Sequence, residues 1–157
     1  MKKWLLILFT LIIFTTLQLS WPVSLRFFNA NPDLLLIFSV SLVFYFDFKI
    51  ALVSGILAGL FKDAFLPSAL AINTFSFAVW SYLTFRLSSQ ISTENSYVRL
   101  AIILIIAVLN NAATGMQSLS SGSFIPAGIF LRTLIISSVY TMALSPLVFK
   151  LAKKISR

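Results

Sequence analysis

Apolar runs occupy most of the chain and are separated only by short polar breaks. Runs of this kind, close to the ~20 residues that a helix needs to cross a bilayer, predict transmembrane helices rather than the core of a water-soluble domain. We expect an all-α integral membrane protein, a six-transmembrane-helix bundle forming a single domain over residues 1–157. Its helices should lie at about residues 4–20, 33–47, 50–62, 70–87, 97–116 and 126–150.

The second and third runs are both short, and only Asp47-Phe48-Lys49 separates them. They are either two helices in a tight hairpin or one long span with two charges in its middle. Burying Asp47 and Lys49 at the depth of the lipid chains would cost several kcal/mol. The sequence therefore favours the hairpin.

The distribution of basic residues indicates the orientation, because cytoplasmic loops of membrane proteins are enriched in Lys and Arg. With six spans and a cytoplasmic N-terminus, only Arg26, Lys62 and Arg132 lie outside. Five spans would place the basic C-terminal tail outside and strand Lys49 in the membrane. We therefore expect a bacterial inner-membrane protein with both termini in the cytoplasm. Its nine inner basic residues are Lys2, Lys3, Lys49, Arg86, Arg99, Lys150, Lys153, Lys154 and Arg157.

Composition narrows the chemistry. The chain is 59% hydrophobic and 10% charged, and it contains neither cysteine nor histidine. These two absences exclude disulfides and thiol chemistry, and they remove the usual zinc ligands and the commonest general base. The net charge of +8 lies at segment ends and at the C-terminus, which suits an anionic lipid surface rather than nucleic acid. We expect no cofactor and no bound metal.

In this topology, polar side chains from several segments fall at one outer level. Two aspartates there could suggest an aspartyl protease, whose paired carboxylates share a proton. Both lie at helix ends, however, and Lys62 beside Asp63 favours an ionised carboxylate, so paired or solvated interfacial charges are the preferred interpretation. The members of this outer cluster are Asp33, Lys62, Asp63, Asn73, Asn110, Asn111 and Arg132.

Two features of the cluster leave alternatives open. The amides of Asn73, Asn110 and Asn111 either bond between helices or line an outward-facing cavity together with Arg132. Arg132, about 9 Å into its helix at 1.5 Å per residue, either snorkels outward or pairs with Asp33 or Asp63.

The third segment carries a stripe of small residues, Ala51, Gly55 and Gly59, on one helix face. Small side chains let a neighbouring helix approach closely, which is how helices associate in lipid. The stripe serves either internal packing or an external partner. As a hypothesis, the hairpin of the second and third helices uses this stripe and its outer charges to dock a partner's transmembrane helix.

Three motifs resemble the family of the rod shape-determining protein MreD. They are Asn31-Pro32-Asp33-Leu34-Leu35-Leu36, the Gly-x-x-x-Gly-x-x-x-Asp arrangement from Gly55 to Asp63, and Ala71-Ile72-Asn73-Thr74. Ala69-Leu70-Ala71 departs from the family, which often has a glycine before the fourth helix. The residues that match the family pattern are Pro32, Asp33, Gly55, Gly59 and Asp63, none of which has a catalytic role in the family.

The resemblance implies a non-enzymatic subunit of the bacterial cell-elongation machinery. Members of the family bind MreC in the membrane, and together they connect MreB filaments with the peptidoglycan synthase RodA and its partner transpeptidase. The family fold is similar to that of the substrate-binding subunits of energy-coupling factor transporters. A transporter subunit of that type is therefore the alternative. Such subunits present an Ala-x-x-x-Ala pattern on the first helix, whereas residues 4–20 contain no alanine or glycine.

Overall fold

The computed structural model describes residues 2–22, 30–65, 72–93, 95–120 and 126–156. These residues are arranged as an all-helical protein, as expected, with six helices in the described ranges. The helices are α1 (Lys2–Leu19), α2 (Leu34–Val43), α3 (Phe48–Phe65), α4 (Ile72–Gln90), α5 (Ser96–Ser120) and α6 (Ala127–Ser156).

Helix α2 is the core of the bundle. All of its residues from Leu34 to Val43 are buried, and among the described residues it packs against α1, α3, α4, α5 and α6. Its sequence, LLLIFSVSLV, has no polar face, which is typical of a helix surrounded on all sides by other helices. At ten residues it is ~15 Å long, about half the thickness of a bilayer's hydrocarbon core.

The hairpin interpretation of residues 33–62 agrees with the structure, which has two packed helices there and not one long helix. The bounds differ from those expected. Helix α2 ends at Val43 because residues 44–46 close a turn, in which the Phe46 N–H bonds to the Leu42 carbonyl at 2.9 Å. Asp47 and Lys49 are exposed at this turn. Helix α3 is longer than predicted and continues past Lys62 and Asp63 to Phe65.

Within the described ranges, two helices are long and apolar enough to cross a membrane, namely Ser96–Ser118 of α5 and the whole of α6. The segments Lys3–Leu19 and Leu34–Val43 are apolar but shorter. Large apolar side chains such as Phe9, Phe75 and Tyr97 are exposed on the outer helices, as expected for a surface in contact with lipid. A crossing of the membrane by all six helices stays a prediction.

Helix α6 passes through Pro146 without ending and runs to Ser156, beyond the expected end at residue 150. Proline lacks the N–H that would bond to the carbonyl four residues earlier, which here belongs to Met142. The hydroxyl of Ser145 donates to that carbonyl at 2.6 Å. A side chain therefore replaces the missing backbone donor, and the helix continues.

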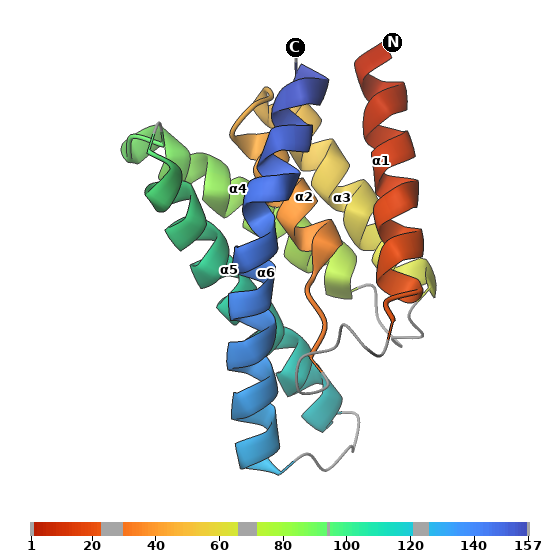
Figure 1. Cartoon of the computed structure of the whole chain (residues 1–157), viewed down its shortest axis with the longest axis vertical. Coiled ribbons are helices and arrows are strands. Elements are labelled where there is room, and N and C mark those ends of the chain that lie inside the picture. The colour runs from red at the N-terminus through yellow and green to blue at the C-terminus, as the bar shows by residue number, and fades with distance from the viewer. Residues whose placement is uncertain (1, 23–29, 66–71, 94, 121–125, 157) are drawn as a thin grey trace.

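Successive helices run in alternating directions, so that the chain begins and ends at the same end of the molecule (Figure 1). Lys3 of α1 donates to the backbone carbonyl of Ser156 at 2.7 Å, which joins these two ends directly. At the opposite end, α5 and α6 extend together beyond the other four labelled helices (Figure 1).

Candidate functional site

Asp33 stands at the start of α2 and is the centre of a buried polar network. It is the N-cap of the helix, and its Oδ1 accepts a hydrogen bond from the backbone N–H of Leu36 at 3.1 Å. Aspartate is among the preferred residues for this position because its carboxylate satisfies a backbone donor that the helix leaves free. Pro32 precedes it and is also buried. Asp33 itself is only 6% exposed, so its charge needs partners within the protein.

The cation that pairs with Asp33 is Lys62 of α3, whose Nζ contacts Asp33 Oδ2. When the side chains are considered without their backbone atoms, Lys62 is 10% exposed and Asp33 is 8% exposed, so both are almost completely buried. The Lys62 ammonium also lies 5.1 Å from the centre of the Phe77 ring, where the negative face of the aromatic system attracts a cation. The sequence places Lys62 next to Asp63, but the structure directs it to an aspartate 29 positions earlier.

Amide side chains complete the surroundings of this ion pair. Gln18 of α1 and Asn110 of α5 each donate to Asp33, to Oδ1 and Oδ2 respectively, at 3.4 Å. Asn110 in turn accepts a hydrogen bond from the indole N–H of Trp80 in α4 at 3.1 Å. Asn110 therefore bonds between helices, as one of the two alternatives for the asparagines predicts.

Helix α6 joins the network through hydroxyl groups. The backbone N–H of Asp33 donates to Thr141 Oγ1 at 3.1 Å, and Ser137 donates to the carbonyl of Asn31 at 2.7 Å. Each of the helices α1 to α6 thus contributes at least one polar group. We call this set the Asp33 network, and its members are Gln18, Asp33, Lys62, Trp80, Asn110, Ser137 and Thr141.

Asp63, which follows the small-residue stripe of α3 four residues after Gly59, has a different role. Its Oδ1 accepts from the backbone and side-chain nitrogens of Asn73 at 3.2 and 2.7 Å. Its Oδ2 accepts from the backbone N–H and the hydroxyl of Thr74 at 2.8 and 2.6 Å. These are the first-turn donors of α4, which begins at Ile72, so a carboxylate on α3 satisfies the free N–H groups and complements the positive end of α4.

The arrangement of the two aspartates is structural. A carboxylate pair of the aspartyl-protease type requires the two groups to share a proton. Here Asp33 is occupied by a lysine and two amides, whereas Asp63 is occupied by donors of α4. In the part of the chain that the structure describes, no group of three or more acidic, histidine or cysteine side chains could hold a metal ion.

Two residues of the small-residue stripe of α3, Gly55 and Gly59, face α4. Ala51 is completely buried. A Cβ placed on Gly59 would lie 2.6 Å from the Asn73 carbonyl oxygen and 2.7 Å from the Thr74 nitrogen, and one on Gly55 would collide with the Ser81 side chain. The stripe lets α3 and α4 approach within the chain, and none of its three residues is available to another protein. The structure therefore supports internal packing, the first of the two alternatives, and the docking of a partner helix on the stripe stays an untested prediction that finds no free face there.

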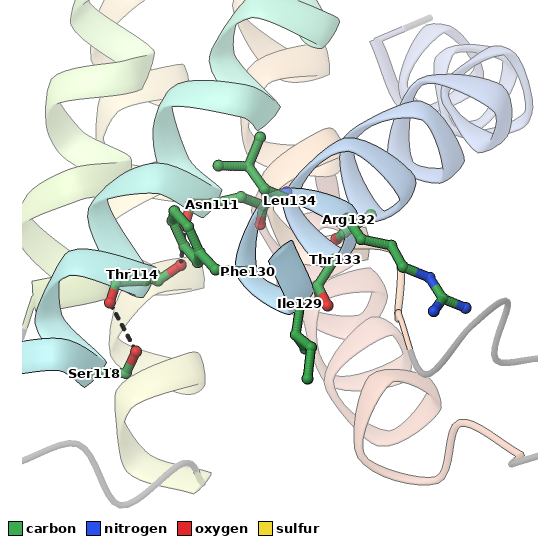
Figure 2. Close-up of a pocket in the computed structure, with 10 residues that line it drawn as sticks. Asn111, Thr114, Ser118, Ile129, Phe130, Arg132, Thr133 and Leu134 are labelled. Atoms are coloured by element: carbon green, nitrogen blue, oxygen red, sulfur yellow. Dashed lines mark hydrogen bonds between the residues drawn. The ribbon is translucent and has the colours of Figure 1, made fainter. Parts of the chain in front are cut away.

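Asn111 and Arg132 lie elsewhere, along a groove between the second half of α5 and the first half of α6. The groove has a volume of about 690 Å³. Asn111 spans it by donating to Ser138 at 3.0 Å, while the Arg132 guanidinium points away from the other lining residues (Figure 2). Neither Asp33 nor Lys62 lines this groove, although Ser137 of the Asp33 network does. The residues that line this α5–α6 groove are Asn111, Thr114, Gly115, Ser118, Ile129, Phe130, Arg132, Thr133, Leu134 and Ser137.

Several partners in the Asp33 network were not anticipated from the sequence. Gln18 is the one amide within the first apolar run, which could have marked it as inward-facing. In α6, Ser137, Thr141 and Ser145 recur every four residues and are all buried. Polar residues at this spacing form one helix face, and that face turns toward the bundle interior. Trp80 carried no comparable signal, because tryptophans are common at the surface of membrane proteins.

Six helices around a buried polar network, two of them long and apolar enough to cross a bilayer, define an all-helical protein of the membrane type. The family model described as rod shape-determining protein MreD matches residues 1–155. The chain belongs to this family of membrane proteins. Its members are structural components that determine rod shape, and the family is not a known enzyme family. No curated protein and no solved structure matches the chain.

Proposed function

We propose that the protein is a non-enzymatic scaffold subunit of the bacterial cell-elongation complex. In this proposal it binds the membrane helix of MreC and links MreB filaments with the cell-wall synthase RodA and its transpeptidase. The observation that carries the proposal is the match to the MreD family along residues 1–155.

The use of the charged residues supports a scaffold. Asp33 and Lys62 pair with one another, and Asp63 holds the start of α4. The cavity next to Lys62, between α1 and α3, has a volume of only about 10 Å³, which is at the lower limit for a single water molecule. These charged residues therefore hold helices of the bundle together. A bundle fixed in this way suits a protein that holds others in place.

We further propose that all six helices span the inner membrane and that both termini lie in the cytoplasm. The common position of the two chain ends supports this orientation (Figure 1). The exposed basic residues Lys3, Lys150, Lys153 and Lys154 belong to these ends and suit an anionic inner leaflet. The turn with Lys49 connects α2 to α3, and α2 runs toward the same end (Figure 1).

The transporter alternative requires a ligand site formed by the outer polar cluster. The polar atoms of Asp33, Lys62 and Asn110 are bonded to one another and enclosed by helices. No observation favours this alternative specifically, and the similarity of the fold to transporter subunits stays an expectation.

The test is complementation combined with co-purification. A rod-shaped bacterium depleted of its own MreD becomes round, and expression of this chain with its cognate MreC should restore rods. MreC should be recovered with the tagged chain after extraction in mild detergent. An unrelated six-helix membrane protein carrying the same tag is the control. Round cells together with the absence of MreC from the purified material would contradict the proposed function.

A further inference from the structure

The α5–α6 groove lies beside the Asp33 network, with which it shares Ser137. It extends from Asn111 to Ser118 on α5 and from Ile129 to Ser137 on α6, which corresponds to ~10–12 Å of each helix. Ser118 and Thr133 are small enough to let another backbone approach closely, whereas the Phe130 ring of α6 already covers Gly115. Two turns of a helix would lie along a groove of this length.

The polar groups of the groove offer hydrogen-bond acceptors. The Thr114 hydroxyl donates to the carbonyls of Asn110 and Asn111, both at 3.1 Å, and the Ser118 hydroxyl donates to Gly115 at 2.7 Å. Each of these protons is committed to the protein's own backbone, whereas a hydroxyl oxygen has further lone pairs that can accept. An occupant that supplies donors is therefore complementary to the groove, and a lipid chain has none.

The position of the groove also points to a protein. Arg132 and Lys150 are 18 positions apart on α6, or ~27 Å, so that Arg132 reaches one membrane surface when Lys150 lies at the other. The start of α6 extends beyond the remaining helices together with the end of α5 (Figure 1). Met116, in the last part of α5, and Ile129 and Leu131, in the first part of α6, are 70%, 58% and 56% exposed. Large apolar side chains at the edge of the bilayer gain from being covered by another polypeptide.

An anionic headgroup does not fit the floor of this groove. The one charged residue of the lining is Arg132, and its guanidinium is directed away from Asn111, Thr114 and Ser118 (Figure 2). The hydroxyl oxygens of Thr114 and Ser118 are acceptors there, and acceptors do not bind phosphate oxygens.

We infer that the α5–α6 groove takes one transmembrane helix of a partner protein, with Ser, Thr, Asn or Gln side chains of that helix donating to its hydroxyl oxygens. This inference rests on the proposed function, which supplies MreC as the partner to be tried. It assigns the docking surface to α5 and α6 in place of the stripe on α3.

Disulfide crosslinking in native membranes tests the assignment, because the chain contains no cysteine of its own. Single variants Ser118→Cys and Thr133→Cys are co-expressed with MreC carrying one cysteine at successive positions of its membrane segment. The matched control is Phe75→Cys, which is 73% exposed in the first turn of α4 and thus lies near the same end of the bundle. We expect crosslinks from both groove positions, recurring every three to four residues of MreC, and none from the control.

A second experiment uses variants that keep the shape of the groove but remove the hydroxyl groups proposed to accept hydrogen bonds. Thr114→Val and Thr133→Val replace a hydroxyl with a methyl group of the same shape, and each should lower the recovery of MreC about threefold, as is typical of one interhelical hydrogen bond in a membrane protein. The variant Val139→Thr, which makes the reverse change at an exposed position of α6 outside the groove, should leave recovery unchanged.

The outcomes separate the two proposals. If MreC is recovered but crosslinks only from Phe75→Cys, or if the groove cysteines join two copies of this chain or react only with a lipid probe, the groove is not the docking site and the inference is overturned. If wild-type protein recovers no MreC at all, the proposed function itself fails, and the assignment of the groove fails with it.

Discussion

At the scale of single residues, Asp33 combines two tasks that can be separated. It caps α2 through the Leu36 N–H, and it neutralises Lys62 in a position with little access to solvent. Asparagine caps a helix as well as aspartate does, but it cannot balance a buried ammonium group. The consequences of losing the charge and of losing the cap can therefore be measured one after the other.

We predict that Asp33→Asn lowers the free energy of unfolding by ~3 kcal/mol, because it leaves the buried Lys62 without its counter-charge. Asp33→Ala should cost ~1 kcal/mol more through the lost cap. Adding Lys62→Met to Asp33→Asn should recover part of the loss, since the orphaned charge is removed. Thermal or denaturant unfolding in detergent, followed by tryptophan fluorescence, gives the measurement. A double variant less stable than Asp33→Asn would contradict this account of the network.

The sequence was informative at this scale about which residues matter and less so about their partners. Asp33, Lys62 and Asn110 were all expected at one outer level, and the structure does bring these three together. The pairing of Lys62 with Asp33 depends on the rotation of α3 about its axis, because adjacent residues of a helix point ~100° apart. The packing of Gly55 and Gly59 against α4 fixes that rotation, and this contact is not visible in the sequence.

At the scale of helices, α3 and α4 pack closely because α3 has glycines, Gly55 and Gly59, at the positions that face α4. Gly59 lies against the backbone of the first turn of α4, next to the bonds from Asp63 that hold that same turn. Close packing and the carboxylate cap thus act on one contact. Backbone atoms cannot rotate away from an added methyl group as a flexible side chain can, so this contact should be intolerant of change.

We predict that Gly59→Ala destabilises the protein by ~1–3 kcal/mol, the usual cost of inserting a methyl group into a filled interface. Gly128→Ala is the matched control, because a Cβ there meets nothing within 4 Å and α6 gains a better helix former. The melting temperatures of the two variants in the same detergent provide the comparison. Equal melting temperatures would show that the α3–α4 contact is looser than described.

Helix bounds were harder to predict than the existence of the helices. Residues 97–116 were expected as a helix, and α5 extends this range to Ser96–Ser120; α6 likewise extends 126–150 to Ser156. Polar or basic residues interrupt both extensions, so that a hydropathy pattern assigns them to loops; these residues are Gln117, Ser118 and Ser120 in α5 and Lys153, Lys154 and Ser156 in α6. Helix formation is cooperative, so that a long helix continues into neighbouring polar residues when no glycine or proline stops it.

At the scale of the whole molecule, the alternation of six helices determines where the chain ends lie. Lys3 and Ser156 are in contact, so the two termini must emerge on one side if the helices span the membrane. A five-span arrangement would place them on opposite sides, and this contact could not form.

We predict that a reporter enzyme active only outside the cytoplasm is silent when fused after residue 157. The same reporter inserted between α5 and α6, within residues 121–125, should be active. Activity per cell, normalised to the amount of fusion protein, gives the readout. Strong activity of the C-terminal fusion would refute the proposed orientation together with the six-span count.

The burial of α2 has a consequence for how the protein is made. This ten-residue helix is synthesised before α3 to α6, but part of its surroundings, including Thr141 at the amide of Asp33, belongs to α6 and is synthesised later. Until then α2 has an incomplete shell, and a helix about half as long as the hydrocarbon core is thick is a poor insertion signal by itself. Its stable placement must await the final helix, so that chains interrupted before α6 expose an unfinished core to the cell's membrane proteases.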